Sequence, residues 1–307
     1  MSTTGKLKYS SVRSLVSVRD LDRDKVEEIF TLYRELKAGI RRKLTGDVAL
    51  LFLEPSTRTR VSFEKACREL GLDTCLVTGE SSSLVKGESL FDTLKTFEAL
   101  GFRAVIFRLP FVLYPYDSFL KGLSLSLINA GDGAHQHPTQ GLTDLFTLRE
   151  IYGDLKGLKV LYVGDILHSR VFRSGAPLLR MFGAEVSVCG PRTLVPERMD
   201  AFGVERIFDH LDGGLEWADV VVWLRLQKER QQENFIPSER SYFEHFGLTG
   251  ERYEKLRGYF MHPGPVNRNI DIEGELLYSE KSLVYEQVRN GLPTRMAVIA
   301  WCLDGAR

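Results

Sequence analysis

Short runs of apolar residues recur along the chain and alternate with segments of helical periodicity. A clear example is the run Val-Ala-Leu-Leu-Phe-Leu at 48–53, which has the length and continuity of a buried strand. Beyond a polar turn, apolar residues recur at helical spacing from Phe63 to Leu70, and Gly71 supplies a C-terminal stop. This stretch therefore predicts a strand, a turn and a helix.

The same pattern extends over the whole chain and predicts its architecture. Further strands are expected at 74–77, 104–108, 127–129, 160–163, 186–189, 220–224 and 259–261, and helices after Asp22 and at 89–101, 138–152, 169–182 and 293–303. Polar or charged stretches at 79–87 and 227–241 are expected to be loops. Because strands that alternate with helices imply parallel sheets, we predict an α/β protein with two doubly wound parallel-sheet domains joined by interdomain helices.

The domain boundary is expected at the break between Gly153 and Gly157. Residues 1–152 would form the first domain and residues 153–284 the second. The C-terminal helical segment, 285–307, is expected to pack back on the first domain.

Composition excludes several classes of protein. The 307 residues carry a formal net charge of zero and are 43% hydrophobic, which suits two globular domains and disfavours a nucleic-acid partner. No apolar run is long enough to span a membrane, and the polar N-terminus does not resemble a signal peptide. Four scattered cysteines without a CxxC pair indicate reduced thiols in a cytoplasmic protein.

The turn at 56–60, Ser-Thr-Arg-Thr-Arg, has the composition of a phosphate site. Free N–H groups at a helix N-terminus favour an anion, and Arg58 with the hydroxyls of Ser56, Thr57 and Thr59 would add donors. The alternative is that Ser56 only caps the helix and that the arginines are solvated. An anion would remove the unfavourable placement of two arginines at the positive end of the helix dipole.

Other residues with candidate chemistry allow more than one interpretation. His135 and His137 could be a pair of metal ligands, although no cysteine or acidic cluster completes a site. The segment after Val163 lacks the G-x-G-x-x-G pattern of a dinucleotide loop. Arg108 and Arg225 end apolar runs. Arg108 alone has the character of an ordinary surface arginine, whereas Arg225 can serve a surface ion pair or bind a carboxylate ligand.

Four motifs together resemble one family. Ser-Thr-Arg-Thr-Arg at 56–60, His-Pro-x-Gln at 137–140, Arg-x-Gln at 225–227 and His-Pro-Gly-Pro at 262–265 are similar to motifs of the aspartate and ornithine carbamoyltransferases. The resemblance covers the chain from about Arg13 to the last helix. Arg-x-Gln, together with the lack of the ornithine group's Ser-Met-Gly and His-Cys-Leu-Pro signatures, places the chain with the catalytic chains of the aspartate group.

The resemblance implies a role for each motif. Phosphate binding is expected from Ser56, Thr57, Arg58, Arg108, Ser82 and Lys86, and contacts to the carbonyl oxygen from Thr59, Arg108 and His137. Contacts to the carbamoyl amide are expected from Gln140, Gly264 and Pro265, and aspartate binding from Lys86, Arg170, Arg225 and Gln227. Thr59, Lys86, Arg108 and His137 form the expected catalytic set. Ser81 and Ser83 compete with Ser82 for its role, and the Gly264–Pro265 bond is expected to be cis.

The implied activity is transfer of the carbamoyl group of carbamoyl phosphate to aspartate, in pyrimidine synthesis, without a metal or an organic cofactor. The first domain would bind carbamoyl phosphate and the second aspartate. A homotrimer is implied, in which Ser82 and Lys86 reach the neighbouring subunit's site. A regulatory chain or a dihydroorotase as partner is left open, and neither a nucleic acid nor a membrane is expected.

Two other functions also remain open. The first is carbamoyl transfer to another amine, although an acceptor without two carboxylates would leave Arg170 or Arg225 unpaired. The second is a non-catalytic subunit that binds carbamoyl phosphate in a pyrimidine-pathway complex.

Overall fold

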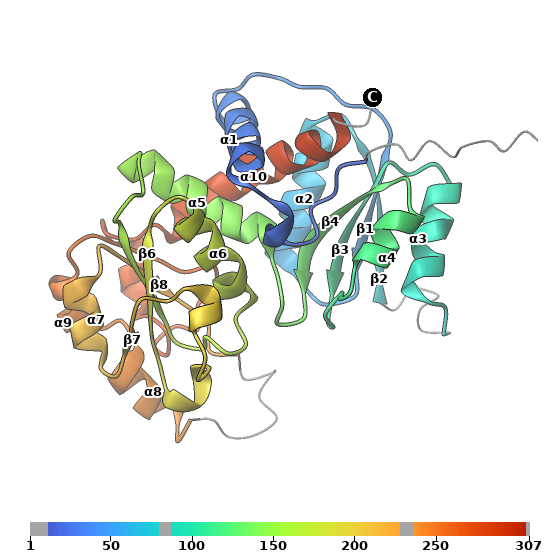
Figure 1. Cartoon of the computed structure of the whole chain (residues 1–307). Coiled ribbons are helices and arrows are strands. Elements are labelled where there is room, and N and C mark those ends of the chain that lie inside the picture. Colours follow the sequence, from blue (N-terminus) through green and yellow to red (C-terminus); the bar gives the residue numbers. More distant parts are fainter. Residues whose placement is uncertain (1–11, 80–86, 228–235, 305–307) are drawn as a thin grey trace, which may run out of the picture. The chain divides into compact units, whose positions relative to one another are not determined.

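The computed structural model describes residues 12–79, 87–227 and 236–304 (Figure 1). The chain forms two compact units. The first combines Asp24–Asp132 with the segments up to Val16 and from Leu292, and the second combines Ser17–Arg23 with Gly133–Gly291. The boundary expected after Tyr152 stays a prediction.

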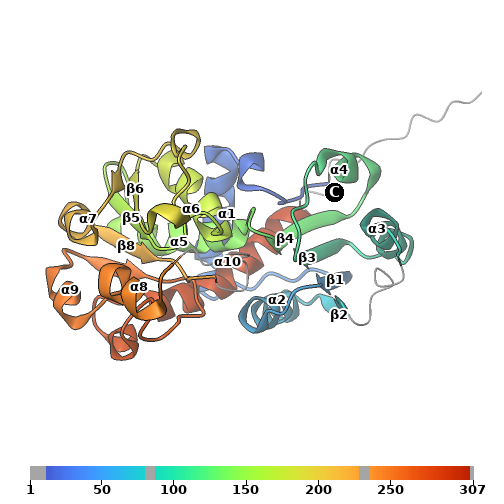
Figure 2. The ribbon, with the colours of Figure 1, turned by 90° about the horizontal axis from the view of Figure 1, so that it is seen from below.

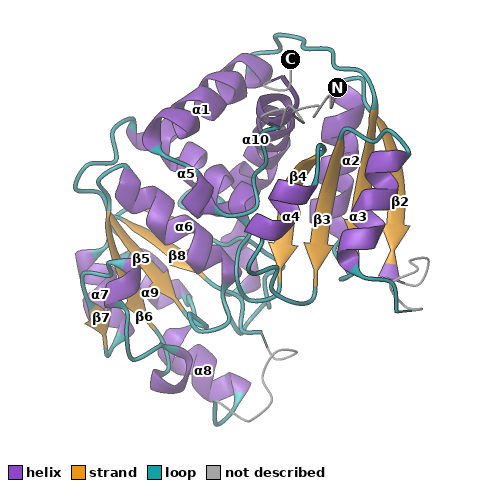
Figure 3. Cartoon of the chain, turned by 45° about the vertical axis from the view of Figure 1, so that its right-hand side comes forward, coloured by secondary structure: helices purple, strands orange, loops and turns teal. Residues whose placement is uncertain are grey.

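The first unit is built on a four-stranded parallel sheet in the order β2-β1-β3-β4. Its strands are β1 (Asp47–Phe52), β2 (Asp73–Thr78), β3 (Ala104–Leu109) and β4 (Ser126–Asp132), and its helices include α1 (Arg23–Lys37), α2 (Thr57–Glu69), α3 (Leu90–Ala99) and α4 (Asp117–Gly122). Helix α2 covers one face of the sheet, and α3 and α4 cover the other (Figure 2). The strands run in one direction (Figure 3), so their carboxyl ends meet at one edge.

The second unit contains a five-stranded parallel sheet in the order β7-β6-β5-β8-β9. Its strands are β5 (Lys159–Val163), β6 (Glu185–Cys189), β7 (Ile207–Phe208), β8 (Val220–Trp223) and β9 (Tyr259–Met261), and its helices are α5 (Pro138–Tyr152), α6 (Arg170–Met181), α7 (Leu211–Trp217), α8 (Glu239–Phe246) and α9 (Gly250–Lys255). Leu161 and Val163 pack into the core with residues of α7, whereas Tyr162 meets Phe172 of α6.

The predicted fold class is confirmed, since both sheets are wholly parallel and carry flanking helices. Among the described residues, no helix is long and apolar enough to cross a membrane.

Two expectations about secondary structure were wrong. Helix α10 (Val284–Asp304) begins nine residues before the expected start at Pro293, which lies inside the helix. Two polar residues of its first turns are buried: Gln287 donates to Asp144, and Asn290 donates to Thr147 of α5. The segment expected as a loop at 227–241 contains the start of α8, where Ser238 caps the helix. Residues 228–235 lie outside the described residues.

Candidate active site

The turn between β1 and α2 presents a helix N-terminus. Ser56 is the N-cap residue with an extended backbone, yet its side chain makes no capping hydrogen bond, and the first turn of α2 carries no acidic residue. Thr57 and Arg58 are exposed, whereas Thr59 is buried. The interpretation of Ser56 as a simple side-chain cap is therefore wrong.

Arg108, near the end of β3, lies beside this turn. Its Nη1 contacts the Thr59 hydroxyl at 3.5 Å and donates to the Ala130 carbonyl at 3.1 Å. Its Nη2 donates to the Glu54 carboxylate at 2.7 Å, and the Arg108 side chain is only 10% exposed. Glu54 therefore lies beside a candidate site residue, although the sequence patterns did not single it out. An anionic ligand would compete with Glu54 for this guanidinium.

The predicted pair His137 and Gln140 stands at the start of α5, and both residues are buried. His137 is the N-cap, with Pro138 as the first helical residue, and its backbone N–H donates to the Ser174 hydroxyl at 2.7 Å. The side-chain nitrogen of Gln140 donates to Asp144 at 2.8 Å, which orients the amide. The proposal of a metal at His135 and His137 gains no support, because the described residues include no group of three or more ligating side chains.

Arg170 and Gln227 lie near the carboxyl ends of β5 and β8. Arg170 is the first residue of α6, is buried, and donates to the Gly133 carbonyl at 3.2 Å. The side chain of Gln227 donates to the His168 carbonyl at 3.0 Å. Its backbone N–H points at the buried carboxylate of Asp165, at 3.4 Å. These two hydrogen bonds connect the loop after β5 with the segment after β8.

The loop that follows β9 carries the predicted cis peptide. The Gly264–Pro265 bond is cis, which confirms the prediction. Gly264 adopts a positive φ of 66°, a conformation that glycine allows. The Gly264 N–H donates to Nδ1 of His262 at 2.8 Å. His262 itself is fully buried.

A buried tyrosine lies behind this part of the second unit. Burial, together with the carboxylates of Asp271 and Asp165, raises the pKa of Tyr242 well above its ordinary value. The phenol is therefore uncharged across the physiological pH range.

The predicted site residues divide between the units. Ser56, Thr57, Arg58, Thr59 and Arg108 belong to the first unit, and His137, Gln140, Arg170, Arg225, Gln227, Gly264 and Pro265 to the second. Ser82 and Lys86 lie outside the described residues.

Comparison with known proteins identifies the class. The sequence profile of the aspartate/ornithine carbamoyltransferase carbamoyl-P binding domain matches residues 13–150, and that of the Asp/Orn binding domain matches residues 156–302. The chain therefore belongs to the aspartate/ornithine carbamoyltransferase family.

Particular relatives narrow the similarity to the aspartate group. The aspartate carbamoyltransferase catalytic subunit of Aquifex aeolicus is 62% identical over 94% of this chain and 98% of its own length. That of Natranaerobius thermophilus is 43% identical over 94% of each chain. Among solved structures, the catalytic subunit of M. jannaschii aspartate transcarbamoylase has a TM-score of 0.81 at 30% identity, covering 95% of this chain and 98% of that one. Aspartate transcarbamoylase from Trypanosoma cruzi in complex with N-(phosphonacetyl)-L-aspartic acid has a TM-score of 0.81 at 26% identity, covering 96% of each chain.

Proposed function

We propose that the protein transfers the carbamoyl group of carbamoyl phosphate to the α-amine of L-aspartate, giving N-carbamoyl-L-aspartate and phosphate in de novo pyrimidine biosynthesis. The observation that carries this conclusion is the 62% identity, over nearly the whole chain, to an aspartate carbamoyltransferase catalytic subunit. The crystal structure of aspartate transcarbamoylase from Trypanosoma cruzi in complex with carbamoyl phosphate and aspartate has a related fold.

The phosphate is assigned to the N-terminus of α2. Ser56, Thr57 and Arg58 would donate to its oxygens, together with Ser82 and Lys86. Two features of α2 support this assignment: Ser56 makes no side-chain capping hydrogen bond, and the first turn carries no acidic residue. The N–H groups at a helix N-terminus favour an anion.

The carbonyl oxygen of the carbamoyl group gains negative charge when the amine attacks. Thr59, Arg108 and His137 are assigned as donors to it, and one donor of this kind typically contributes about 10²–10³ in rate. The contact between Arg108 and the Thr59 hydroxyl supports a shared role. Glu54 would keep Arg108 oriented until substrate arrives.

The carbamoyl amide is assigned to Gln140, Gly264 and Pro265. Because Asp144 accepts from the nitrogen of the Gln140 amide, its oxygen is turned toward other donors, such as the NH₂ group of the substrate. The loop at Gly264 and Pro265 would offer backbone carbonyls to that group and to the incoming amine.

Aspartate is assigned to Arg170, Arg225, Gln227 and Lys86. Two guanidinium groups match two carboxylates, which favours aspartate over an acceptor with a single carboxylate. Fixing both carboxylates makes the attack effectively intramolecular. The amine nitrogen forms a bond to the carbamoyl carbon, the carbon–oxygen bond to phosphate breaks, and the departing phosphate takes up the amine proton.

Calorimetric titration with N-phosphonacetyl-L-aspartate tests this assignment. We expect tight binding that weakens at least about a hundredfold in Arg225→Ala, since a lost bidentate contact to a carboxylate is among the strongest polar interactions. Arg240→Ala is the matched control, because Arg240 is exposed and pairs with Glu244 along α8. Wild-type protein that binds carbamoyl phosphate but not the bisubstrate compound would show that the acceptor is a different amine.

The assembly is part of the proposal. We infer a homotrimer in which Ser82 and Lys86 of one subunit complete the neighbour's site. Mixing inactive Lys86→Ala and His137→Ala subunits after mild dissociation should restore activity, because some sites in the hybrid then carry both intact residues. No recovery of activity in a hybrid trimer would contradict sharing between subunits.

A further inference from the structure

One buried carboxylate in the second unit, that of Asp271, connects two segments that carry assigned site residues. Its side chain is fully buried, and its two oxygens accept from three N–H groups. Oδ1 accepts from the backbone of Leu226 at 3.3 Å, and Oδ2 accepts from the backbone of Asn267 at 2.8 Å and from Nε2 of His262 at 3.2 Å. The two segments follow β8 and β9, whose pairing ends at Val222 and Met261, and beyond the sheet these bonds connect them.

The first segment is Arg225-Leu226-Gln227, beyond the end of β8. The peptide groups around Leu226 are held on both sides, because its N–H donates to Asp271 and its carbonyl accepts from the Asn267 side chain at 3.2 Å. Leu226 is completely buried, whereas Arg225 and Gln227 are partly exposed. Leu226 therefore faces the core, while the side chains on either side of it reach the surface.

The second segment is the loop from His262 to Pro265. Since Nδ1 of His262 accepts from the Gly264 N–H, the ring proton lies on Nε2, which donates to Asp271. Asp271 thereby selects the tautomer that holds Gly264. Gly264 and Pro265 are the residues whose backbone carbonyls are assigned to the carbamoyl amide.

We propose that Asp271 is a positioning residue for the acceptor side of the site, which sets the placement of Arg225 and Gln227 relative to the loop at Gly264 and Pro265. The proposal rests on the function proposed above. Asp271 itself is buried and acts through the backbone of Leu226 and the ring of His262.

The substitution Asp271→Asn should affect the bond to Leu226 differently from the bonds to Asn267 and His262. An amide has one acceptor oxygen, so it cannot serve donors at both carboxylate positions. With its oxygen at the Oδ2 position, the amide keeps Asn267 and His262 but turns its NH₂ group toward the Leu226 N–H. With its oxygen at the Oδ1 position, it loses the other two. The first orientation preserves more bonds, so Asp271→Asn should chiefly release the segment that carries Arg225 and Gln227.

The test is steady-state kinetics of the full chain with both substrates, together with inhibition by inorganic phosphate. In Asp271→Asn we expect the aspartate KM to rise at least about tenfold, because small displacements of binding groups have large kinetic effects. The inhibition constant of phosphate should change by less than about threefold, since the assigned phosphate donors of the described residues lie in the first unit. A purely structural role would lower the active fraction, and so kcat, without moving the aspartate KM.

Asp219→Asn provides the matched control. It makes the same substitution in the same unit, at a carboxylate that accepts from the backbone N–H of Lys159 at 3.0 Å at the amino end of the strands. The one acceptor oxygen of an amide can still serve this single donor. Its aspartate KM should stay within about twofold of wild type. Asn267→Ala offers a milder change: it removes only the bond to the Leu226 carbonyl and should raise the aspartate KM about threefold or more.

The outcomes are distinct. An unchanged aspartate KM in folded Asp271→Asn, or equal changes in Asp271→Asn and Asp219→Asn, would overturn the proposal. If Asp271→Asn does not fold, an unchanged aspartate KM in Asn267→Ala overturns it. If the wild-type chain itself fails to carbamoylate aspartate, the proposed function is wrong, and that result is recognised before any variant is compared.

Discussion

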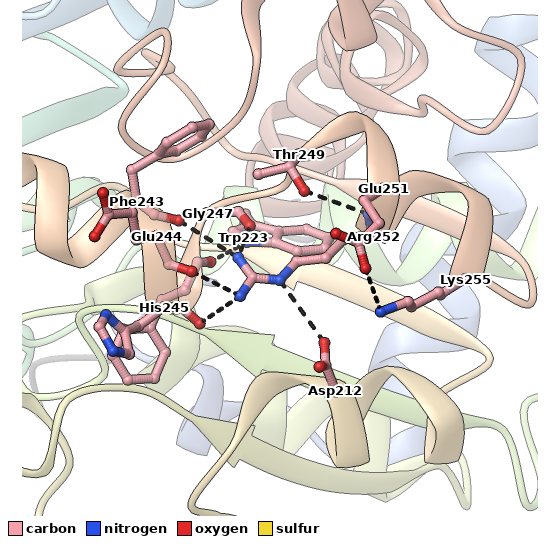
Figure 4. A network of polar contacts seen from close by, with 11 residues as sticks. Asp212, Trp223, Phe243, Glu244, His245, Gly247, Thr249, Glu251, Arg252 and Lys255 are labelled. Carbon is pink, nitrogen blue, oxygen red and sulfur yellow. Dashed lines mark hydrogen bonds and ion pairs between the residues drawn. The ribbon is translucent and has the colours of Figure 1, made fainter.

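Arg252 closes the C-terminus of α8, and replacing it should destabilise the second unit. Its guanidinium donates to the backbone carbonyls of Glu244 at 2.8 Å, His245 at 3.2 Å and Gly247 at 2.7 Å, as Figure 4 shows. These are carbonyls that a helix end cannot satisfy within itself. The ion pair with Asp212, at 3.8 Å, adds little because Asp212 is exposed.

The expected magnitude follows from these contacts. A hydrogen bond from a charged group contributes about 1.5–3 kcal/mol. Glu244 and His245 are exposed residues, so water can replace the lost bonds to their carbonyls after truncation. The carbonyl of buried Gly247 has less access to solvent. Arg252→Ala should therefore lower the free energy of unfolding by about 2–4 kcal/mol. For a unit of this size the loss corresponds to a fall in Tm of about 5–15 °C.

Differential scanning calorimetry measures the change, and hydrogen exchange of the α8 amides locates it. Arg240→Ala is the control, since its side chain is 90% exposed and its pair with Glu244 should contribute less than about 0.5 kcal/mol. Arg252→Lys keeps the charge but lacks the forked geometry, so it should fall between the two. If Arg252→Ala has the same Tm as Arg240→Ala, the contacts to the carbonyls do not stabilise the helix and the reasoning is wrong.

Two further predictions concern buried groups. Gly175→Ala should destabilise the protein by about 1–3 kcal/mol despite the better helix propensity of alanine, because the new Cβ would clash with the buried Tyr162 hydroxyl. Most of the loss should vanish when the same change is made in a Tyr162→Phe background, and equal losses in both backgrounds would exclude the clash. Burial raises the pKa of the Cys67 and Cys189 thiols to about 12. Above pH 9 these thiols therefore ionise in the unfolded chain but not in the folded protein, and the free energy of unfolding should fall as pH rises from 9 toward 12. In thermal melts across this window the fall should be shallower in Cys67→Ala and unchanged in Cys75→Ser, whose thiol is exposed; an equal slope in all three proteins would refute the assignment.

The elements that could be predicted from the sequence are those with strong local signals. Helix α5 runs from Pro138 to Tyr152 as expected, because proline marks its first residue and Gly153 its end. Strand β9 also matches its predicted range. The elements that were missed, such as β7 and α7, are two and seven residues long, too short to show a period of their own.

The start of α10 shows why some boundaries depend on tertiary contacts. Gln287 and Asn290 break the apolar pattern, and Pro293 has the chemistry of a first helical residue, so the sequence favoured a late start. In the structure these amides are buried against α5, where Asp144 and Thr147 accept their hydrogen bonds. No local pattern reveals that a polar residue has a buried partner 143 positions away.

In the candidate site, too, some residues could be predicted from local sequence and others depend on long-range contacts. Side chains that would face the substrates could be proposed from motifs that resemble those of one family. Their positions after strand ends agree with this, because the carboxyl ends of parallel strands share an edge. The carboxylates that hold them could not be proposed in this way, because each acts at long range: Glu54 reaches Arg108 across 54 positions, and Asp271 reaches Leu226 across 45. A short segment such as Arg225–Gln227 has too few internal bonds to orient two side chains, so an acceptor from elsewhere in the chain must fix it. For Asp271 this has a testable consequence: the residue types that contact aspartate would determine which acceptor binds, whereas a carboxylate without a substrate contact would determine how closely that acceptor approaches the carbamoyl carbon.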